Sequence, residues 1–299
     1  MTARGDSVAD RDRVAGRVFV AGAGLMGHGI AQVFAAIGRD VVLYEPDLGR
    51  ATSGRDRIAG NLDRAVAKGR LDQGTRDATV SRIEPTDDAG RVADAGLVVE
   101  AVFEDVGVKT ALWSDLDARA RADAIFATNT SSISIDRLAD AVSPARRQRF
   151  IGMHFFSPVP VMPLVEVIRG SATSDQTEAA VRQAATELGK QVIASADRPG
   201  FIVNRILMPF LAEAMRGLEE GLGTAEDIDT GAKVGLNHPM GPLELADFIG
   251  LDVCLGIMRV LYEGLGDERF RPPRILEDLV AAGRLGQKTG RGFHAYPRG

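Results

Sequence analysis

The chain of 299 residues is 45% hydrophobic and 26% charged, with a formal charge of -5 and a pI of about 5.5, as in a globular protein of one or two domains without a nucleic-acid partner. Its single cysteine, Cys254, excludes an intrachain disulfide and a cysteine zinc cluster. No apolar run approaches the roughly 18 to 20 residues that a membrane span requires, so we expect no membrane partner.

The first segment, residues 1–16 (MTARGDSVADRDRVAG), is rich in small and charged residues. It lacks the apolar stretch of a secretory signal, so we interpret it as a mobile N-terminal tail. Together with the single cysteine, this favours a cytoplasmic protein, because disulfides are rare in that reducing compartment.

Residues 17–198 alternate short apolar runs with segments of helical periodicity. Runs such as VVLY and LVVEAV are continuously apolar, as expected of strands that are buried on both faces. The predicted strands are Arg17–Ala21, Asp40–Tyr44, Gly96–Val102, Ala124–Ala127, Phe150–His154, Leu164–Ile168 and Gln191–Ala194. The predicted helices are Leu25–Ile37, Leu48–Lys68, Val106–Ala120 and Asp175–Leu188. This alternation predicts an α/β fold with a Rossmann-type, doubly wound and mostly parallel sheet.

The pattern changes at Pro199-Gly200, a dipeptide that interrupts regular structure. Beyond it we find helical patterns and no convincing strand, and Thr224 followed by acidic residues is typical of a helix N-cap. The predicted helices are Ile202–Glu220, Pro242–Phe248, Leu251–Tyr262 and Ile275–Ala282. The sequence thus predicts two domains, an α/β domain over 17–198 and an all-helical domain over 199–299.

Gly22, Gly24 and Gly27 form a GxGxxG motif between the first predicted strand and the first predicted helix. In such a turn the first glycine permits the tight bend, the second lets the backbone approach a pyrophosphate, and the third lets the helix pack on the sheet. The helix N-terminus then offers N–H groups to the phosphates. Packing alone can also require small residues here, and the glycines leave NAD, FAD and a vestigial site open.

Glu45 ends the second predicted strand about 20 residues after the glycines, where an acid can hold the ribose diol of the adenosine. A carboxylate would repel the 2′-phosphate of NADP, and no arginine directly follows it. The combined placement of strand, helix and acid favours nucleotide binding over a packing turn, and NAD over NADP.

His154 ends one apolar strand, and Glu166 lies in the next, PLVEVI. A carboxylate in such surroundings is costly to bury without a partner. Paired with imidazole it would fix the tautomer and stabilise the imidazolium, as a general acid/base requires. The same pair could instead only join two strands, and the spacing does not decide. The other histidines, His28, His238 and His294, lie in turns or near the chain end and suggest surface or structural roles.

Two polar residues follow apolar segments at places where ligands bind. Ser131, in TNTSSISI, follows a predicted strand and could donate to a substrate oxygen, although its local pattern favours an ordinary helix cap. Asn204, in FIVNRIL, follows the domain junction, where its amide could reach an interdomain cleft or satisfy buried backbone groups.

Seven motifs in order give the sequence a specific resemblance. They are GAGLMGHGIAQVFA, VVEAVFEDVGVK, TNTSS, HFFSPVPVMPLVEVI, RPGFIVNR, DIDTGAKVGLNHPMGPLELADFIGLD and GQKTGRGFHAY. Between about Arg17 and Tyr296 the chain resembles the 3-hydroxyacyl-CoA dehydrogenase family, most closely its stand-alone short-chain members, the 3-hydroxybutyryl-CoA dehydrogenases. The resemblance implies NAD as cofactor and an acyl-CoA thioester as substrate.

The resemblance implies a role for each candidate catalytic residue. His154 would take the proton of the 3-hydroxyl while hydride leaves C3 for the nicotinamide, and Glu166 would hold and polarise it. Ser131 would hydrogen-bond the reacting oxygen, and Asn204 would position the substrate and the histidine.

The resemblance also implies contacts with NAD and coenzyme A. The positions that match NAD contacts are Gly22, Ala23, Gly24, Leu25, Met26, Gly27, Glu45, Glu104, Lys109, Ser131 and Lys288. Lys68 matches a lysine that contacts coenzyme A, and Asn61 occupies a neighbouring contact position where serine is familiar. Because the helical domains of the family form its dimer interface, we expect a homodimer.

The sequence departs from the family pattern beside the predicted catalytic strands. Ser157 replaces an asparagine and Pro163 stands where lysine is common, which bears on acyl-chain preference. One alternative is a dehydrogenase of a non-CoA hydroxy acid, of the L-gulonate or carnitine type, but Phe155-Phe156 favours a CoA thioester because those relatives tend to replace this pair. The other is a non-catalytic NAD-binding protein, which would need none of the four candidate catalytic residues.

Overall fold

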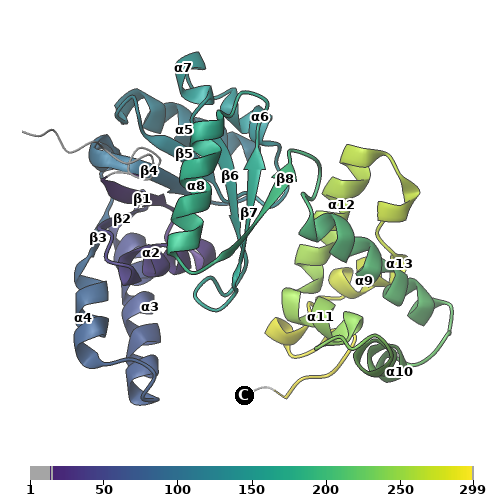
Figure 1. Ribbon diagram of the computed structural model, residues 1–299. Coiled ribbons are helices and arrows are strands. Elements are labelled where there is room, and N and C mark those ends of the chain that lie inside the picture. Colours follow the sequence, from purple (N-terminus) through teal and green to yellow (C-terminus); the bar gives the residue numbers. More distant parts are fainter. Residues whose placement is uncertain (1–13, 15, 298–299) are drawn as a thin grey trace, which may run out of the picture. The chain divides into compact units, whose positions relative to one another are not determined.

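Figure 1 shows the computed structural model, which describes residue 14 and residues 16–297. Of the predicted N-terminal tail, residues 1–13 and 15 lie outside the described residues. The chain divides into two units, Met1–Arg198 and Pro199–Gly299.

The first unit is built on an eight-stranded sheet of order β3-β2-β1-β4-β5-β6-β7-β8. All neighbouring strands pair in parallel except β6 and β7, which are antiparallel. The strands are β1 Arg17–Ala21, β2 Val41–Tyr44, β3 Ile83–Thr86, β4 Ala95–Glu100, β5 Ile125–Thr128, β6 Phe150–Phe155, β7 Leu164–Arg169 and β8 Gln191–Ala196. The predicted Rossmann-type, mostly parallel sheet is confirmed, and β3 is an additional edge strand.

Helices cover both faces of this sheet, as in a doubly wound fold (Figure 1). They are α2 Leu25–Ala36, α3 Leu48–Ala67, α4 Gln73–Ser81, α5 Val106–Arg119, α6 Ile135–Ala139, α7 Pro144–Arg147 and α8 Asp175–Glu187, with a 3₁₀ turn η1 at Ala89–Asp94. Asp47 and Asp105 cap α3 and α5, since each side chain accepts a hydrogen bond from a backbone N–H of its first turn.

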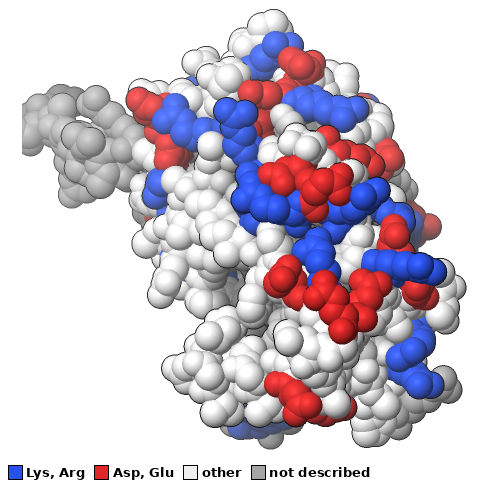
Figure 2. All heavy atoms as spheres, turned by 90° about the vertical axis from the view of Figure 1, so that its right-hand side faces the viewer, with Lys and Arg blue, Asp and Glu red and all other residues white. Residues whose placement is uncertain are grey.

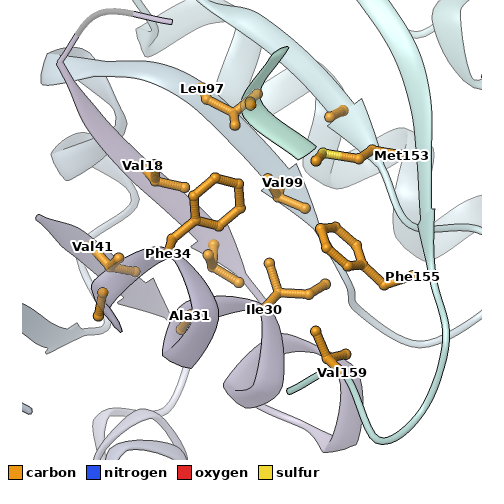
Figure 3. Close-up of a cluster of buried hydrophobic side chains, with 14 of the residues drawn as sticks. Val18, Ile30, Ala31, Phe34, Val41, Leu97, Val99, Met153, Phe155 and Val159 are labelled. Carbon is orange, nitrogen blue, oxygen red and sulfur yellow. The ribbon is translucent and has the colours of Figure 1, made fainter. Parts of the chain in front are cut away.

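Alternating residues of the central strands point into two different cores. On one face Ile30 and Phe34 of α2 pack with Val18 and Val99 (Figure 3). On the other face Trp113 of α5 stacks 4.9 Å from the ring of Phe126 and meets Phe150 edge-on at 5.0 Å. Burial of each such side chain contributes about 1.5–3 kcal/mol, so the two cores hold the carboxyl ends of the strands in fixed positions.

The second unit is helical and has its own apolar core, built from α9, α11, α12 and α13. Its elements are α9 Val203–Glu219, α10 Ala225–Thr230, a π-turn η2 at Gly231–Gly235, α11 Pro242–Ile249, α12 Leu251–Leu265, η3 Glu268–Phe270, α13 Arg274–Ala281 and η4 Gln287–Thr289. The N-cap predicted at Thr224 is present and forms a reciprocal capping box with Asp227.

On the face in Figure 2, acidic and basic side chains are interspersed. The described residues include no helix that is long and apolar enough to span a membrane.

Candidate functional site

The glycine turn joins β1 to α2, and two of its glycines are required by the packing of the protein itself. Gly22 has a φ of +103°, and a Cβ there would lie 2.5 Å from the carbonyl oxygen of Ala101. A Cβ at Gly27 would overlap with the carbonyl oxygen of Gly22. The third glycine, Gly24, is different, because a Cβ there would meet open space.

Gly24 is also the N-cap of α2, and this helix has neither a side-chain cap nor an acidic residue in its first turn. Its first N–H groups and its partial positive charge are therefore available to an anion. Together with the exposed backbone at Gly24 and Leu25, this arrangement fits the pyrophosphate of a dinucleotide. Met26 is half-buried and packs against the core.

Glu45 follows β2 and reaches the same turn. Its Oε1 accepts a hydrogen bond of 2.9 Å from the backbone N–H of Ala23. The carboxylate is only half-buried, so it stands at the turn and remains accessible to a ligand. This position suits an acid that holds a ribose diol beside the phosphates.

His154 and Glu166 are directly opposite each other in the antiparallel pair of β6 and β7. Directly opposed residues project from the same face, and Nδ1 of His154 lies 2.7 Å from Oε2 of Glu166. The imidazole is buried and the carboxyl group is fully buried. Because a carboxylate only accepts, Nδ1 carries the proton of this bond, and Nε2 is the basic nitrogen.

The TNTSS loop leaves the carboxyl end of β5, beside β6. Oδ1 of Asn129 accepts from the N–H of Phe155 at 2.8 Å, which ties the loop to the residue that follows His154. Ser131 itself does not cap a helix, since α6 begins later and is capped by Ser134. The loop thus places Ser131 at the same edge of the sheet as the glycine turn.

Glu104 is hydrogen-bonded to three successive residues of this loop. Its Oε1 accepts from the hydroxyl of Thr130 at 2.6 Å, from the N–H of Ser131 at 2.8 Å and from the hydroxyl of Ser132 at 3.0 Å. Burial opposes its ionisation, but the charge of Lys109 and the hydrogen bonds from Thr130 and Ser131 outweigh it and lower the pKa of Glu104.

Lys109 is almost completely buried, with 1% of its side chain exposed. Its Nζ lies 2.5 Å from Oε1 of Glu100 and 3.1 Å from Oε2 of Glu104. Glu100 also accepts from the hydroxyl of Thr128 at 2.7 Å, and burial raises the pKa of Glu100 despite these partners. Lys109 is therefore embedded between two carboxylates.

The loop between β6 and β7 carries both departures, Ser157 and Pro163, and both side chains are exposed. Buried Lys190 holds its backbone, since Nζ donates to the carbonyl oxygens of Val159 at 2.6 Å and Met162 at 2.8 Å. Burial lowers the pKa of Lys190. The carbonyl oxygen of Pro163 accepts from the backbone N–H after Lys190 at 2.7 Å.

Asn61 lies on α3, and Lys68 is the C-cap of this helix. Asn61 accepts a hydrogen bond from Arg64, and both residues line a pocket of about 460 Å³. The remaining lining residues are His28, Ser53, Asp56, Arg57 and Gly60. Lys68 is exposed, so α3 presents cationic and amide groups to solvent along one side of this unit.

Two candidate residues belong to the helical unit. Asn204 lies in the first turn of α9. Lys288 lies in η4, and its Nζ is 2.5 Å from Oδ1 of Asp252. This contact holds Lys288 against the start of α12.

Three polar residues were not among the sequence candidates, although they hold those candidates in place. Glu100 ends the apolar run GLVVE, and an acid in a buried strand is the same signal that singles out Glu166. Asn129 is visible only as a member of TNTSS. Lys190 has no local signal, because its partners are carbonyl oxygens about thirty residues away.

The fold and the glycine turn define a dinucleotide-binding α/β unit that is followed by a helical unit, the organisation of a two-domain dehydrogenase. Sequence profiles identify it further: residues 17–198 match the 3-hydroxyacyl-CoA dehydrogenase NAD binding domain, and residues 200–296 match the C-terminal domain. The chain belongs to the 3-hydroxyacyl-CoA dehydrogenase family and is an NAD-dependent oxidoreductase.

Individual relatives match over nearly their whole length. A 3-hydroxybutyryl-CoA dehydrogenase of Bradyrhizobium diazoefficiens is 50% identical over 280 residues, which cover 94% of this chain and 95% of the relative. A probable 3-hydroxybutyryl-CoA dehydrogenase of Deinococcus radiodurans is 48% identical, covering 93% and 99%. The crystal structure of (S)-3-hydroxybutyryl-CoA dehydrogenase from Ralstonia eutropha is similar with a TM-score of 0.91 and 44% identity, covering 95% and 100%.

Proposed function

We propose that this dehydrogenase interconverts (S)-3-hydroxyacyl-CoA and 3-ketoacyl-CoA thioesters of short chain, with 3-hydroxybutyryl-CoA as the preferred substrate. The names of the similar proteins support the substrate. The observation that carries the mechanism is the buried hydrogen bond between His154 and Glu166, on the strand pair beside the TNTSS loop.

In this proposal NAD, when bound, accepts or returns the hydride of the substrate's C3. His154 takes the proton of the 3-hydroxyl on Nε2, and in the reverse direction returns it to the ketone oxygen. Glu166 holds the ring by Nδ1 and stabilises the imidazolium that forms. General acid/base catalysis of this kind contributes about 10²- to 10⁴-fold.

The other candidates have positioning and binding roles. Ser131 donates to the reacting oxygen, and Asn204 is a further candidate for orienting the substrate. Gly22 to Gly27 and Glu45 hold the pyrophosphate and adenosine ribose of NAD, and Lys288 is a further candidate NAD contact. Asn61 and Lys68 bind coenzyme A, whose phosphates suit a cationic helix face.

The assembly and location follow the same reasoning. A homodimer through the helical unit is supported by the large apolar side chains that this unit exposes, among them Leu222 at 82%, Val234 at 80% and Ile206 at 68%. A cytoplasmic location is supported by the single, buried cysteine.

The experiment that tests this proposal measures NADH oxidation with acetoacetyl-CoA. It compares this substrate with a longer 3-ketoacyl-CoA, and NADH with NADPH. We expect rapid oxidation of NADH, a higher kcat/KM for acetoacetyl-CoA, and little use of NADPH. NADH binding without turnover of either thioester would overturn the proposal and favour a non-CoA hydroxy acid or a binding protein.

Glu45 offers a separate test of cofactor binding. Replacing Glu45 with alanine removes the carboxylate that faces the ribose, so we expect the NADH dissociation constant to rise about tenfold, as for one charge-assisted hydrogen bond. Fluorescence titration with NADH and NADPH measures it. An unchanged dissociation constant would mean that other groups hold the ribose.

A further inference from the structure

The last residues of β6 extend past the end of the neighbouring strand β5. The parallel pairing of these strands ends where Thr128 lies opposite Gly152, whereas the antiparallel pairing with β7 continues to Phe155. Among the described strands, the end of β6 that carries His154 is therefore paired with β7 alone. An N–H group that faces the side of β5 there needs another acceptor, because it is costly to bury unpaired.

The side chain of Asn129 supplies this acceptor. Its Oδ1 accepts from the backbone N–H of Phe155 at 2.8 Å, and both residues are buried, with 9% and 2% of their surface exposed. The backbone N–H of Asn129 donates in turn to the carbonyl oxygen of Glu100 in β4, also at 2.8 Å. The amide thus takes the place of a further residue of β5 and anchors the end of β6 to the centre of the sheet.

Phe155 is also held by its side chain, which packs with Ile30 of α2 and with Val159 in the apolar core (Figure 3). Because successive side chains of a strand point to opposite faces, His154 projects from the other face, where it meets Glu166. The core contact and the hydrogen bond to Asn129 fix the residue after His154 from two directions. They therefore set where the imidazole stands at the edge of the sheet.

The segment from Asn129 to Ser131 is held just as firmly, because the residue between them is fully buried and hydrogen-bonded on both sides. The backbone N–H of Thr130 donates to the hydroxyl of Thr128 at 3.2 Å. The hydroxyl oxygen of Thr130 accepts from the backbone N–H of Ile133 at 2.9 Å. A displacement of Asn129 is therefore transmitted to Ser131 as well as to β6.

We propose that Asn129 is a positioning residue that sets the spacing between His154 and Ser131. It acts on His154 through Phe155 and on Ser131 through Thr130. Both His154 and Ser131 are proposed to bind the same substrate oxygen, so their separation decides whether one oxygen can reach both. The inference rests on the function proposed above and adds to it a residue that acts without touching the substrate.

The test removes the acceptor in two ways. Asn129→Leu has a side chain of similar size without an acceptor. Asn129→Ser is too short to reach Phe155 and leaves room for a water molecule to bind its N–H group, which protects the fold. We expect both variants to lower kcat/KM for acetoacetyl-CoA by about tenfold to a hundredfold, since a displacement of about 1 Å at a reacting group can have that effect.

A double-mutant cycle with Ser131→Ala separates positioning from a general loss of structure. If Asn129 places the hydroxyl of Ser131, its replacement matters less once that hydroxyl is absent. The loss of kcat/KM caused by either Asn129 variant should therefore be smaller by about threefold or more in Ser131→Ala than in wild type, because groups that act together are not additive. A merely structural role gives the same loss in both backgrounds.

Thr173→Val is the matched control, because it removes buried hydrogen bonds at the opposite end of the same strand. The hydroxyl of Thr173 donates to the carbonyl oxygen of Phe150, the first residue of β6, at 2.6 Å, and it accepts from the backbone N–H of Gly170 at 2.9 Å. Thr173 is buried, as Asn129 is. Thr173→Val should lower the melting temperature and leave kcat/KM within about twofold of wild type, since distant sites act independently.

The possible outcomes are distinct. A wild-type kcat/KM in folded Asn129→Leu or Asn129→Ser overturns the positioning role, as does an equal loss in both backgrounds of the cycle or a comparable loss in Thr173→Val. His154→Gln keeps this inference apart from the proposed function. A wild-type rate in His154→Gln overturns the proposed function, whereas a loss there without a loss in the Asn129 variants overturns the positioning role alone.

Discussion

The described residues include two histidine–carboxylate pairs with hydrogen bonds of equal length, one in each unit. In the α/β unit Nδ1 of His154 lies 2.7 Å from Glu166, and in the helical unit Nε2 of His294 lies 2.7 Å from Asp229. Position near the chain end suggests a surface role for His294, but its side chain is only 19% exposed. A short hydrogen bond between imidazole and carboxylate is thus no evidence of catalysis by itself.

The two pairs differ in what surrounds each ring and each acid. Asp229 also accepts from the backbone N–H groups of Leu243 and Glu244 at the start of α11, and the other ring nitrogen of His294 faces Glu226 at 3.8 Å. Both nitrogens of His294 are directed at acids of the same unit. His154 instead lies beside the TNTSS loop, on the strand pair where ligands of such sheets bind. The surroundings make His154–Glu166 a candidate acid/base pair and indicate that His294–Asp229 is a structural contact that holds the C-terminal segment.

The largest expected contrast is between the two histidines changed to glutamine. We expect His154→Gln to lower kcat by about 10²- to 10⁴-fold, because the proton acceptor is lost. NADH affinity should stay within about twofold of wild type, since the glycine turn is intact. Steady-state rates and NADH titration measure the two effects. A wild-type rate in His154→Gln would remove the distinction between the pairs.

A smaller effect is expected when Glu166, the acid of the candidate acid/base pair, loses its charge. Glu166→Gln can still accept from Nδ1 but stabilises the imidazolium less, by about 1.5–3 kcal/mol, which corresponds to roughly tenfold to a hundredfold in kcat. Asp229→Asn is its counterpart in the helical unit and should leave kcat unchanged. Equal losses of kcat in the two variants would contradict the comparison.

His294→Gln should act on stability alone. Loss of the buried bond to Asp229 should lower the free energy of unfolding by about 1–3 kcal/mol, measured by denaturant titration. Its kcat at a temperature well below unfolding should match wild type. A loss of kcat without a loss of stability would instead indicate a catalytic role for His294.

The smallest loss of stability is expected at Tyr296, which adds a second contact between the C-terminal segment and the helical unit. Its hydroxyl donates to Oδ2 of Asp247 at 3.1 Å, and burial together with the charge of Asp247 raises the pKa of Tyr296. Tyr296→Phe should lower stability by about 0.5–1.5 kcal/mol. Thermal unfolding of Tyr296→Phe and His294→Gln compares the two losses of stability. A larger loss in Tyr296→Phe would mean that Tyr296 contributes more than His294 to holding the C-terminal segment.

Much of the fold follows from local pattern, and the exceptions have physical reasons. Apart from Arg17 at the start of β1, strands β1 and β2 are continuously apolar and bounded by glycine or acidic residues, so their position is visible in the sequence. β3 reads IEPT, a short run with a charge and a proline. Such a strand is tolerated at a sheet edge, and only its pairing with β2 defines it. The polar helix α4 likewise lacks a strong apolar face.

Some residues of the candidate site can likewise be found from the sequence, and others only from the structure. The glycine turn and the acids at strand ends have local signals, because a motif or an unexpected charge marks them. The burial of Lys109 has no local sequence signal, because its partners come from β4 and from the segment before α5. On sequence alone a lysine near a helix start is a solvent-exposed cation, and only the packed structure shows the two carboxylates around it.

The contacts of Lys190 have a consequence for how substrate preference can diverge. Lys190 and the residue after it bind the loop between β6 and β7 only through main-chain oxygens, at Val159, Met162 and Pro163. A proline fits at the last of these because that residue needs only to accept. At these three positions the loop is held through backbone atoms, so a change at the exposed positions Ser157 and Pro163 should leave the register that brings His154 and Glu166 together unchanged.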